Sequence, residues 1–409
     1  MSKLAEVYAR ACGIDPSQIG HMEIMEKYYP LPFQNYFTIQ AGSGQGAKNY
    51  DYWNSVIELL IPLLQQNNIT LVQIGGKDDI PLKYCHNLLG QTDTNQSFYI
   101  VNRSLFHFGN DSFAAHVVGD KGLPLVECFG ETCARNHSPF TYNKDKSIFI
   151  ESHRNDNLPT FASNESPKTI NYIKPEDVAK AVFQILSINY TSPISTWFIG
   201  SNYNAFILEF VPDHDLPPSF MPENPVTVRL DLHFDEVKMA TATMSGRKVN
   251  IVTNKPININ LLRNIKSNIL GINYEINLND DLSYIKDLKK LAVSLKFFSK
   301  ERDKDKLSQI RLKFFDLCQI IFMEDRTKNH FIEDCEKYLN KKLDKEVKFD
   351  ILSYRSNKFM LAGNKIFTSK AAWKADKSVA NFDQNITQVI DNEDFWNDYQ
   401  FYNIFEKLV

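Results

Sequence analysis

Short apolar runs alternate with longer segments of helical spacing in this chain, and this alternation constrains the fold more than any other feature. Positions 37–41 and 69–74 are mostly apolar, which is typical of buried strands. Between them, residues 53–64 carry apolar side chains at the spacing of one helix face. Strands that alternate with helices favour a parallel, doubly wound α/β sheet, so we expect a Rossmann-like domain. Further strands are expected at 105–108 and 123–129, and further helices at 97–103 and from Pro175 onward.

The same alternation begins again in the second half of the chain. Residues 212–225 contain five prolines, and such a segment is extended and stiff. We therefore expect a first Rossmann-like domain over 1–211, a linker over 212–225 and a second α/β domain over 226–409. Its expected strands are 226–234, 249–253, 272–276, 292–298 and 318–322, its helices are 257–270, 282–291 and 304–315, and a C-terminal amphipathic helix covers 393–408.

Composition narrows the class of protein. The 409 residues are 43% hydrophobic and 23% charged, which is typical of a globular chain. A net charge of −3 does not indicate binding to nucleic acid. None of the six cysteines forms a Cys-x-x-Cys pair, so we expect neither a zinc site nor a disulfide framework, and a cytoplasmic setting. The longest apolar segment, 56–64, is too short to be a transmembrane segment, and the N-terminus lacks the pattern of a signal peptide.

A glycine-rich loop follows the first strand. Gly42, Gly44 and Gly46 alternate with other residues there, Ser43 adds a hydroxyl, and Lys48 adds a positive charge. Such a loop can bring backbone amides close to a phosphate, and the lysine can pair with it. A flexible turn with a solvated lysine is an equally good interpretation of the loop taken alone.

Polar residues also follow the next strands. Gly75, after the second strand, indicates a tight turn when taken alone, and Gly130 and Thr132 form a turn whose amides could hold a phosphate or a nucleobase. Asp111 and Ser112 stand where a strand meets a helix, and His116 lies one turn further on. Open α/β sheets bind ligands at such carboxyl ends of strands, so we interpret these three as functional. His107, inside an apolar strand, is interpreted as structural.

These motifs, in this order, resemble the donor-binding domain of glycosyltransferase family 9, the heptosyltransferase-like enzymes with the GT-B fold. The resemblance covers about residues 30–185. It implies that a nucleotide-sugar donor binds here without a metal or another cofactor. The implied diphosphate ligands are Ser43, Gly44 and Lys48, the implied ligands of the sugar–phosphate end are Asp111, Ser112 and His116, and Gly75, Gly130 and Thr132 complete the donor site.

The chain departs from the family in two respects. Phe113 stands where the family usually has glycine, and the donor domain comes first, whereas the family places it second. The family's catalytic carboxylate therefore has no counterpart here. Asp231, His233 and Asp235 would share one face of a strand, and we name Asp235, with His116, as a catalytic candidate. A polar strand face turned to solvent is the simpler interpretation of these three.

The leading hypothesis is an inverting, metal-independent glycosyltransferase that moves a sugar from a nucleotide donor to an acceptor hydroxyl. A non-catalytic GT-B-like binding or structural protein is the alternative, and a sugar epimerase of related architecture is a third. The sequence does not identify the nucleobase, the sugar or the acceptor. It does not indicate an oligomeric state either.

Overall fold

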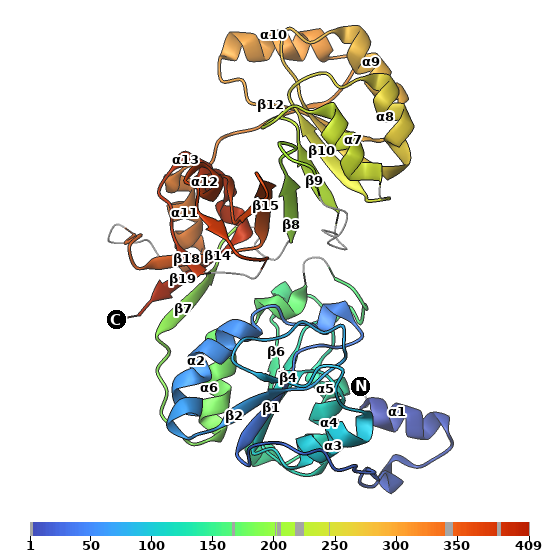
Figure 1. Cartoon of the computed structure of the whole chain (residues 1–409), viewed down its shortest axis with the longest axis vertical. Coiled ribbons are helices and arrows are strands. Elements are labelled where there is room, and N and C mark those ends of the chain that lie inside the picture. Colours follow the sequence, from blue (N-terminus) through green and yellow to red (C-terminus); the bar gives the residue numbers. More distant parts are fainter. Residues whose placement is uncertain are drawn as a thin grey trace. The chain divides into compact units, whose positions relative to one another are not determined.

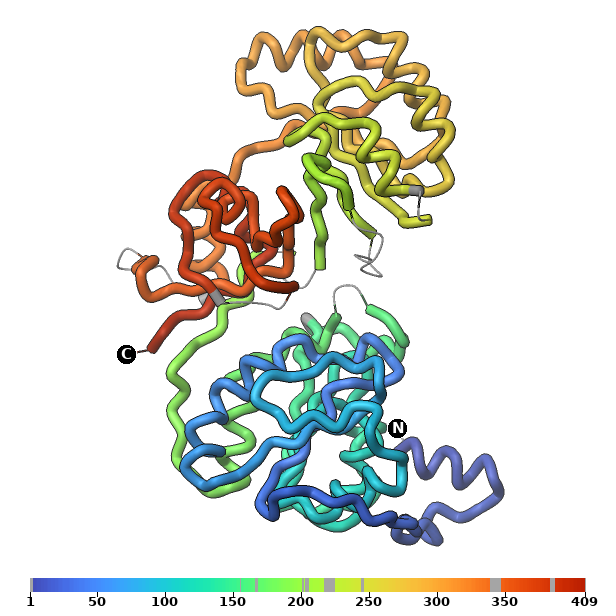
Figure 2. Tube along the Cα trace, viewed as in Figure 1, coloured from blue at the N-terminus to red at the C-terminus, as the bar shows by residue number. Residues whose placement is uncertain are grey.

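The computed structural model describes residues 3–165, 168–200, 202, 206–216, 225–244, 246–339, 347–382 and 386–408. The chain divides into two compact units (Figures 1 and 2). Unit 1 comprises Met1–Thr196 and Glu406–Val409, and unit 2 comprises Trp197–Phe405. No helix in these ranges is both long enough and apolar enough to cross a membrane.

The boundary between the two units lies between residues 196 and 197, and not at the predicted position 211. The reason is β8 (Ile207–Phe210), which pairs in parallel with β9 (Val226–Arg229) and with β15 (Lys358–Ala362), so that it belongs to the sheet of unit 2. Of the predicted linker, residues 217–224 lie outside the described ranges.

Unit 1 is built on a parallel sheet of six strands in the order β3-β2-β1-β4-β5-β6. The order reverses between β1 and β4, as in the doubly wound folds that bind nucleotides at this position. The prediction of a parallel α/β sheet is confirmed. The strands are β1 (Tyr36–Gln40), β2 (Thr70–Gln73), β3 (His86–Asn87), β4 (Phe106–Asn110), β5 (Leu125–Phe129) and β6 (Ser147–Glu151).

Helices cover both faces of this sheet (Figure 1). On one face α2 (Trp53–Gln66) packs against α6 (Pro175–Ile185), and on the other α3 (Thr94–Asn102) packs against α4 (Phe113–Asp120). Every residue of β1, β4 and β5 is buried, as expected for strands covered on two sides.

An N-terminal segment, which the sequence pattern did not predict as structured, lies against α4. It begins with α1 (Leu4–Ala11) and a short 3₁₀ helix (Pro16–Gln18). The Asp120 carboxylate at the end of α4 accepts hydrogen bonds from His21 Nδ1 at 3.0 Å and from the Met22 amide at 3.2 Å. The segment is thereby joined to the helix that carries His116.

Unit 2 contains a nine-stranded sheet in the order β13-β12-β11-β10-β9-β8-β15-β16-β17. The pairs from β13 to β15 are parallel, and β16 and β17 add antiparallel pairs at one edge. The predicted second α/β domain is confirmed in this part. Its further elements are β10 (Val249–Thr253), β11 (Ile269–Glu275), β12 (Ser294–Ser299), β13 (Ile320–Phe322), β16 (Lys365–Phe367), β17 (Ser378–Val379), α7 (Glu236–Met244), α8 (Ile259–Ile265), α9 (Leu282–Lys290) and α10 (Lys304–Phe314).

The structure also contains a four-stranded sheet, in the order β18-β14-β19-β7. The predicted C-terminal helix is wrong here, because α13 (Glu393–Asp398) ends early and β19 (Tyr402–Lys407) follows. Tyr402, Ile404 and Phe405 are buried in succession, and aromatic and β-branched residues favour a strand in such surroundings. The remaining elements are β7 (Ile194–Phe198), β14 (Leu352–Ser356), β18 (Ile386–Gln388), α11 (Lys328–Leu339) and α12 (Lys370–Lys374).

Candidate donor-binding site

The predicted site residues of unit 1 follow the carboxyl ends of its strands. Lys48 lies in the loop after β1, Asp111 directly follows β4, and Thr132 lies just after β5. Because these strands are parallel neighbours, their carboxyl ends meet at one edge of the sheet, where its order reverses.

Three of these residues are in direct contact. Lys48 Nζ lies 2.8 Å from Asp111 Oδ2, and the Thr132 hydroxyl donates a hydrogen bond to the same oxygen at 2.9 Å. The side chain of Lys48 is 15% exposed and that of Asp111 is 5% exposed. The structure therefore brings together residues from three loops that are up to 84 positions apart in the sequence, from Lys48 to Thr132.

The glycine-rich loop is held by its own hydrogen bonds. The Ser43 amide donates to Asn49 Oδ1 at 2.8 Å, and the Ser43 hydroxyl donates to the Gln45 carbonyl at 2.8 Å. A short 3₁₀ helix (Gly46–Lys48) then directs Lys48 toward Asp111. A Cβ atom at Gly44 would meet nothing within 4 Å, so this position is open.

Gly42 and Gly75 are needed for a reason that the sequence analysis missed. A Cβ atom at Gly42 would lie 2.1 Å from Asp79 Cγ, and one at Gly75 would lie 2.2 Å from Asp79 Oδ2. The Asp79 carboxylate also accepts a hydrogen bond from the Gly76 amide at 2.9 Å. The two glycines therefore leave room for a carboxylate that joins the loops after β1 and β2.

The Gly130–Thr132 turn is fixed by Arg154, which the sequence analysis also missed. Its guanidinium donates from Nε to the Gly130 carbonyl at 2.6 Å and from Nη2 to the Thr132 carbonyl, and it pairs with Glu151 at 3.0 Å. The signal available in the sequence was its position just after the strand 147–151, at the same edge of the sheet. A Cβ atom at Gly130 would lie 2.5 Å from the amide nitrogen of Ile170, so glycine is required for this packing.

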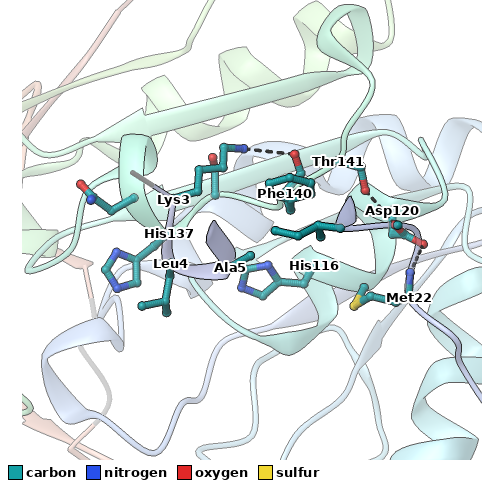
Figure 3. A pocket seen from close by; sticks show the side chains of 13 residues that line it. Lys3, Leu4, Ala5, Met22, His116, Asp120, His137, Phe140 and Thr141 are labelled. Atoms are coloured by element: carbon teal, nitrogen blue, oxygen red, sulfur yellow. Dashed lines mark hydrogen bonds between the residues drawn. The ribbon is translucent and has the colours of Figure 1, made fainter. Parts of the chain in front are cut away.

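Ser112 and His116 differ in their surroundings. Ser112 precedes α4, and its hydroxyl oxygen is buried without a hydrogen-bond partner in the described residues. His116, one turn into α4, lines a cavity of about 170 Å³ together with Lys3 and His137 (Figure 3). Burial lowers the pKa of His116, and the nearby Asp111 carboxylate opposes this shift. The imidazole is therefore neutral at pH 7 and can accept a proton.

Two further carboxyl groups lie near the Lys48–Asp111 pair. Glu127 and Glu131 are both 0% exposed, and neither has a hydrogen bond from another side chain or backbone group in the described part of the chain. Burial raises the pKa of Glu127 well above its usual range and that of Glu131 to about 7, and the Asp111 charge adds to both shifts. Neither glutamate was singled out in the sequence.

His107 is structural, as predicted. It is fully buried in β4, its Nδ1 lies 3.0 Å from the Thr38 hydroxyl, and burial lowers its pKa to about 3.

The three candidates of unit 2 do not share a strand face. Strand β9 ends at Arg229, because its guanidinium bonds to both Asp231 oxygens at 2.8 Å and the chain turns there. His233 is exposed in this turn. Asp235 instead caps α7, since its Oδ1 accepts hydrogen bonds from the amides of residues 237 and 238 at 3.0 and 2.9 Å. The prediction of one polar strand face is therefore wrong.

Among the described residues, no group of three or more histidine, cysteine, aspartate or glutamate side chains is arranged to hold a metal ion.

Comparison with known proteins finds solved structures that are similar to this chain. No family model matches the chain, and no curated protein matches it. A glycosyl transferase of family 9 from Veillonella parvula is 17% identical over 45% of this chain and 50% of that chain, with a TM-score of 0.31. The ADP-heptose heptosyltransferase II of E. coli is 17% identical over 46% and 52% of the two chains, with a TM-score of 0.29. The heptosyltransferase TibC, in complex with ADP-D-beta-D-heptose, is 14% identical over 43% and 51%, with a TM-score of 0.34.

The chain thus spans about half the length of these three structures. The family indicated by the sequence motifs is among the solved structures similar to this chain.

Proposed function

We propose that unit 1 binds the diphosphate of a nucleotide-sugar and that the protein transfers the sugar to an acceptor hydroxyl. The observation that carries the proposal is the buried contact of Lys48 Nζ with Asp111 Oδ2, joined by the Thr132 hydroxyl. It lies at the carboxyl edge where the strand order reverses, which is the place where doubly wound sheets bind nucleotides.

In this proposal Lys48 binds the phosphate oxygens, and Asp111 holds the lysine in place. Ser43 and Gly44 contribute to the phosphate site from the first loop, Gly75 from the second, and Gly130 and Thr132 from the loop after β5. The unpartnered hydroxyl of Ser112 can donate to an oxygen at the sugar–phosphate end. Of these ligands, the resemblance implies Ser43, Gly44 and Lys48 for the diphosphate and Ser112 for the sugar–phosphate end, where it also implies Asp111 and His116.

The transfer itself forms a bond from the acceptor oxygen to the anomeric carbon and breaks the bond from this carbon to the diphosphate. The acceptor proton passes to a base, and His116 can accept it because its imidazole is neutral at pH 7. The charge left on the diphosphate is stabilised by Lys48 and by the positive N-terminal end of α4. We therefore propose an inverting reaction that uses no metal or other cofactor.

A non-catalytic binding protein is the second candidate function. It is favoured by Asp235, whose carboxylate is engaged as a helix cap, and by Phe113, which is 38% exposed beside the candidate site. Donor binding without donor turnover, in the presence of varied acceptors, would support this candidate.

The first test is a thermal-shift panel with UDP, GDP, ADP, CMP and TDP, each beside a sugar-nucleotide. A ligand present at about 100 times its dissociation constant should stabilise the protein by roughly 2.7 kcal/mol. Lys48→Ala should lose this shift. Lys146→Ala removes the same charge from an exposed position before β6, at the opposite edge of the sheet, and should keep it. Equal shifts in both variants, or no shift with any ligand, would refute the donor site.

A further inference from the structure

Glu131 is a buried acid beside a site proposed to bind an anion. It stands between Gly130 and Thr132, whose carbonyls are held by Arg154. Its side chain is 0% exposed, and both carboxyl oxygens lack a hydrogen-bond partner within the described ranges. A buried polar group without a partner is costly, so such a group at a binding site points to a ligand that supplies the missing partner.

Burial is the main reason that the ionised form of Glu131 is disfavoured. The Asp111 and Glu165 carboxylates raise its proton affinity, and the Lys48 ammonium opposes them. Glu127 adds a second fully buried carboxyl group next to Asp111. The guanidinium of Arg154 is engaged with two carbonyls and with Glu151.

Two imidazoles face the same region from α4 and from α5 (Ala134–His137). They belong to His116 and His137, and burial lowers the pKa of both. Both are therefore neutral near pH 7, and neither supplies a positive charge to offset the carboxyl groups.

The segment 160–164 covers this residue. The Phe161 amide donates to the Glu131 carbonyl at 3.0 Å, and the Ala47 amide donates to the Ser163 carbonyl at 3.0 Å. The Phe161 ring lies 5.6 Å from the His137 ring. The segment thus bridges the loop that carries Glu131 and the glycine-rich loop, so these two loops lie side by side.

We propose that Glu131 is an anion-binding residue whose protonated carboxyl donates a hydrogen bond to the bound diphosphate, so that binding takes up a proton. This inference rests on the proposed function, from which it takes the chemical class of the ligand, a diphosphate. A bound dianion next to Lys48 adds two negative charges to a region that already holds four carboxyl groups, those of Asp111, Glu127, Glu131 and Glu165. Proton transfer from solvent to Glu131 removes one of these charges and supplies the missing hydrogen-bond partner.

The pH dependence follows from this linkage. The free protein loses the Glu131 proton as the pH rises through about 7, whereas the complex keeps it. The dissociation constant should therefore rise with pH above 7 and approach a tenfold increase per pH unit. Glu131→Gln retains a donor group and should show a constant affinity between pH 6.5 and 8.5.

The experiment is isothermal titration of the full chain at pH 7.8 in Tris and in HEPES, which differ in ionisation enthalpy. The two probes are inorganic sulfate and the sugar-nucleotide that gives the largest shift in the thermal-shift panel. Neither probe gains or loses a proton near pH 7.8. The wild type should take up close to one proton per bound probe, and Glu131→Gln should take up none. Glu127→Gln is the matched control, because it removes the other buried carboxyl group beside Asp111 and leaves Glu131 in place, so the proton uptake should persist.

Each outcome decides one or both proposals. Binding of the sugar-nucleotide without proton uptake overturns the role of Glu131 and leaves the donor site standing. Proton-linked binding of sulfate without sugar-nucleotide binding supports Glu131 and refutes the proposed donor. Proton uptake that persists in Glu131→Gln overturns the assignment, and the absence of binding by either probe overturns both proposals.

Discussion

The Asp79 carboxylate occupies the space that a side chain at Gly42 would require. A Cβ atom at Gly42 would lie 2.1 Å from Asp79 Cγ, well inside van der Waals contact. The acid thus explains the glycine in the loop after β1, although the two residues lie 37 positions apart. It also joins this loop to the one after β2 through the Gly76 amide.

Gly42→Ala should destabilise unit 1 by about 1 kcal/mol, because the new methyl group displaces the partly exposed Asp79 carboxylate and breaks its hydrogen bond from the Gly76 amide. Thermal unfolding measures the effect. Asp79→Ala should relieve most of it in the double variant, giving a coupling energy of roughly 1 kcal/mol. Gly44→Ala is the control, since its Cβ would meet no atom within 4 Å. Equal destabilisation by Gly42→Ala and Gly44→Ala would contradict the structure.

Thr132→Val should weaken the binding of the diphosphate probe roughly fivefold, corresponding to about 1 kcal/mol for one lost hydrogen bond. The hydroxyl of Thr132 donates to Asp111 Oδ2 at 2.9 Å and so helps to orient the carboxylate that holds Lys48. Thr132→Ser retains the hydroxyl and should bind within twofold of the wild type. A titration in which both variants bind equally would exclude this role of the hydroxyl.

His107 should make the wild type lose stability between pH 7 and 5 relative to a variant without this imidazole, although the raised pKa of Glu131 acts in the opposite direction in both proteins. The pKa of this buried histidine is lowered to about 3 from an ordinary value of 6.5, so the unfolded state binds a proton first as the pH falls. At pH 5 the loss amounts to about 2 kcal/mol. Thermal unfolding of both proteins across this range should show that the stability difference between His107→Gln and the wild type changes by about this amount in favour of the variant. An unchanged stability difference between the wild type and His107→Gln across this range would contradict the prediction.

Glu209→Leu should destabilise unit 2 by about 3–5 kcal/mol, because it leaves two buried cations without their shared partner. Glu209 Oε1 lies 2.8 Å from Arg229 and 3.2 Å from Lys358, and all three side chains are buried. These cations hold the pKa of Glu209 below its usual value despite burial. Glu324→Leu, at an exposed position, serves as the control. A change of less than 1 kcal/mol for Glu209→Leu would show that the three charges contribute little.

The sheet of unit 1 could be predicted because its strands leave strong local signals. Each of β1, β4 and β5 is an apolar run, and the apolar face of α2 repeats at helical spacing. Strand β3 could not be found, since His86 and Asn87 have no hydrophobic pattern and pair only through the neighbouring β2. The C-terminal strand β19 was mistaken for a helix, because burial on both faces removes the alternation that identifies strands.

The candidate site was predictable in its composition and not in its contacts. Lys48 and Asp111 follow strands that must end at one edge, which a sequence can show. The positions of Arg154 and of segment 160–164 depend on packing between distant loops, which leaves no local pattern. The expected strand face of unit 2 failed for the same reason, since the Arg229–Asp231 contact ends β9.

Arg154 also fixes the direction of two peptide groups. A trans peptide unit is planar, so a carbonyl that faces Arg154 fixes the N–H of the next residue on the opposite side. By binding the carbonyls of Gly130 and Thr132, Arg154 turns the N–H groups of residues 131 and 133 away from itself. A buried cation that need not touch any ligand thus sets the polarity of this loop, and Arg154→Met would leave two peptide units free to rotate.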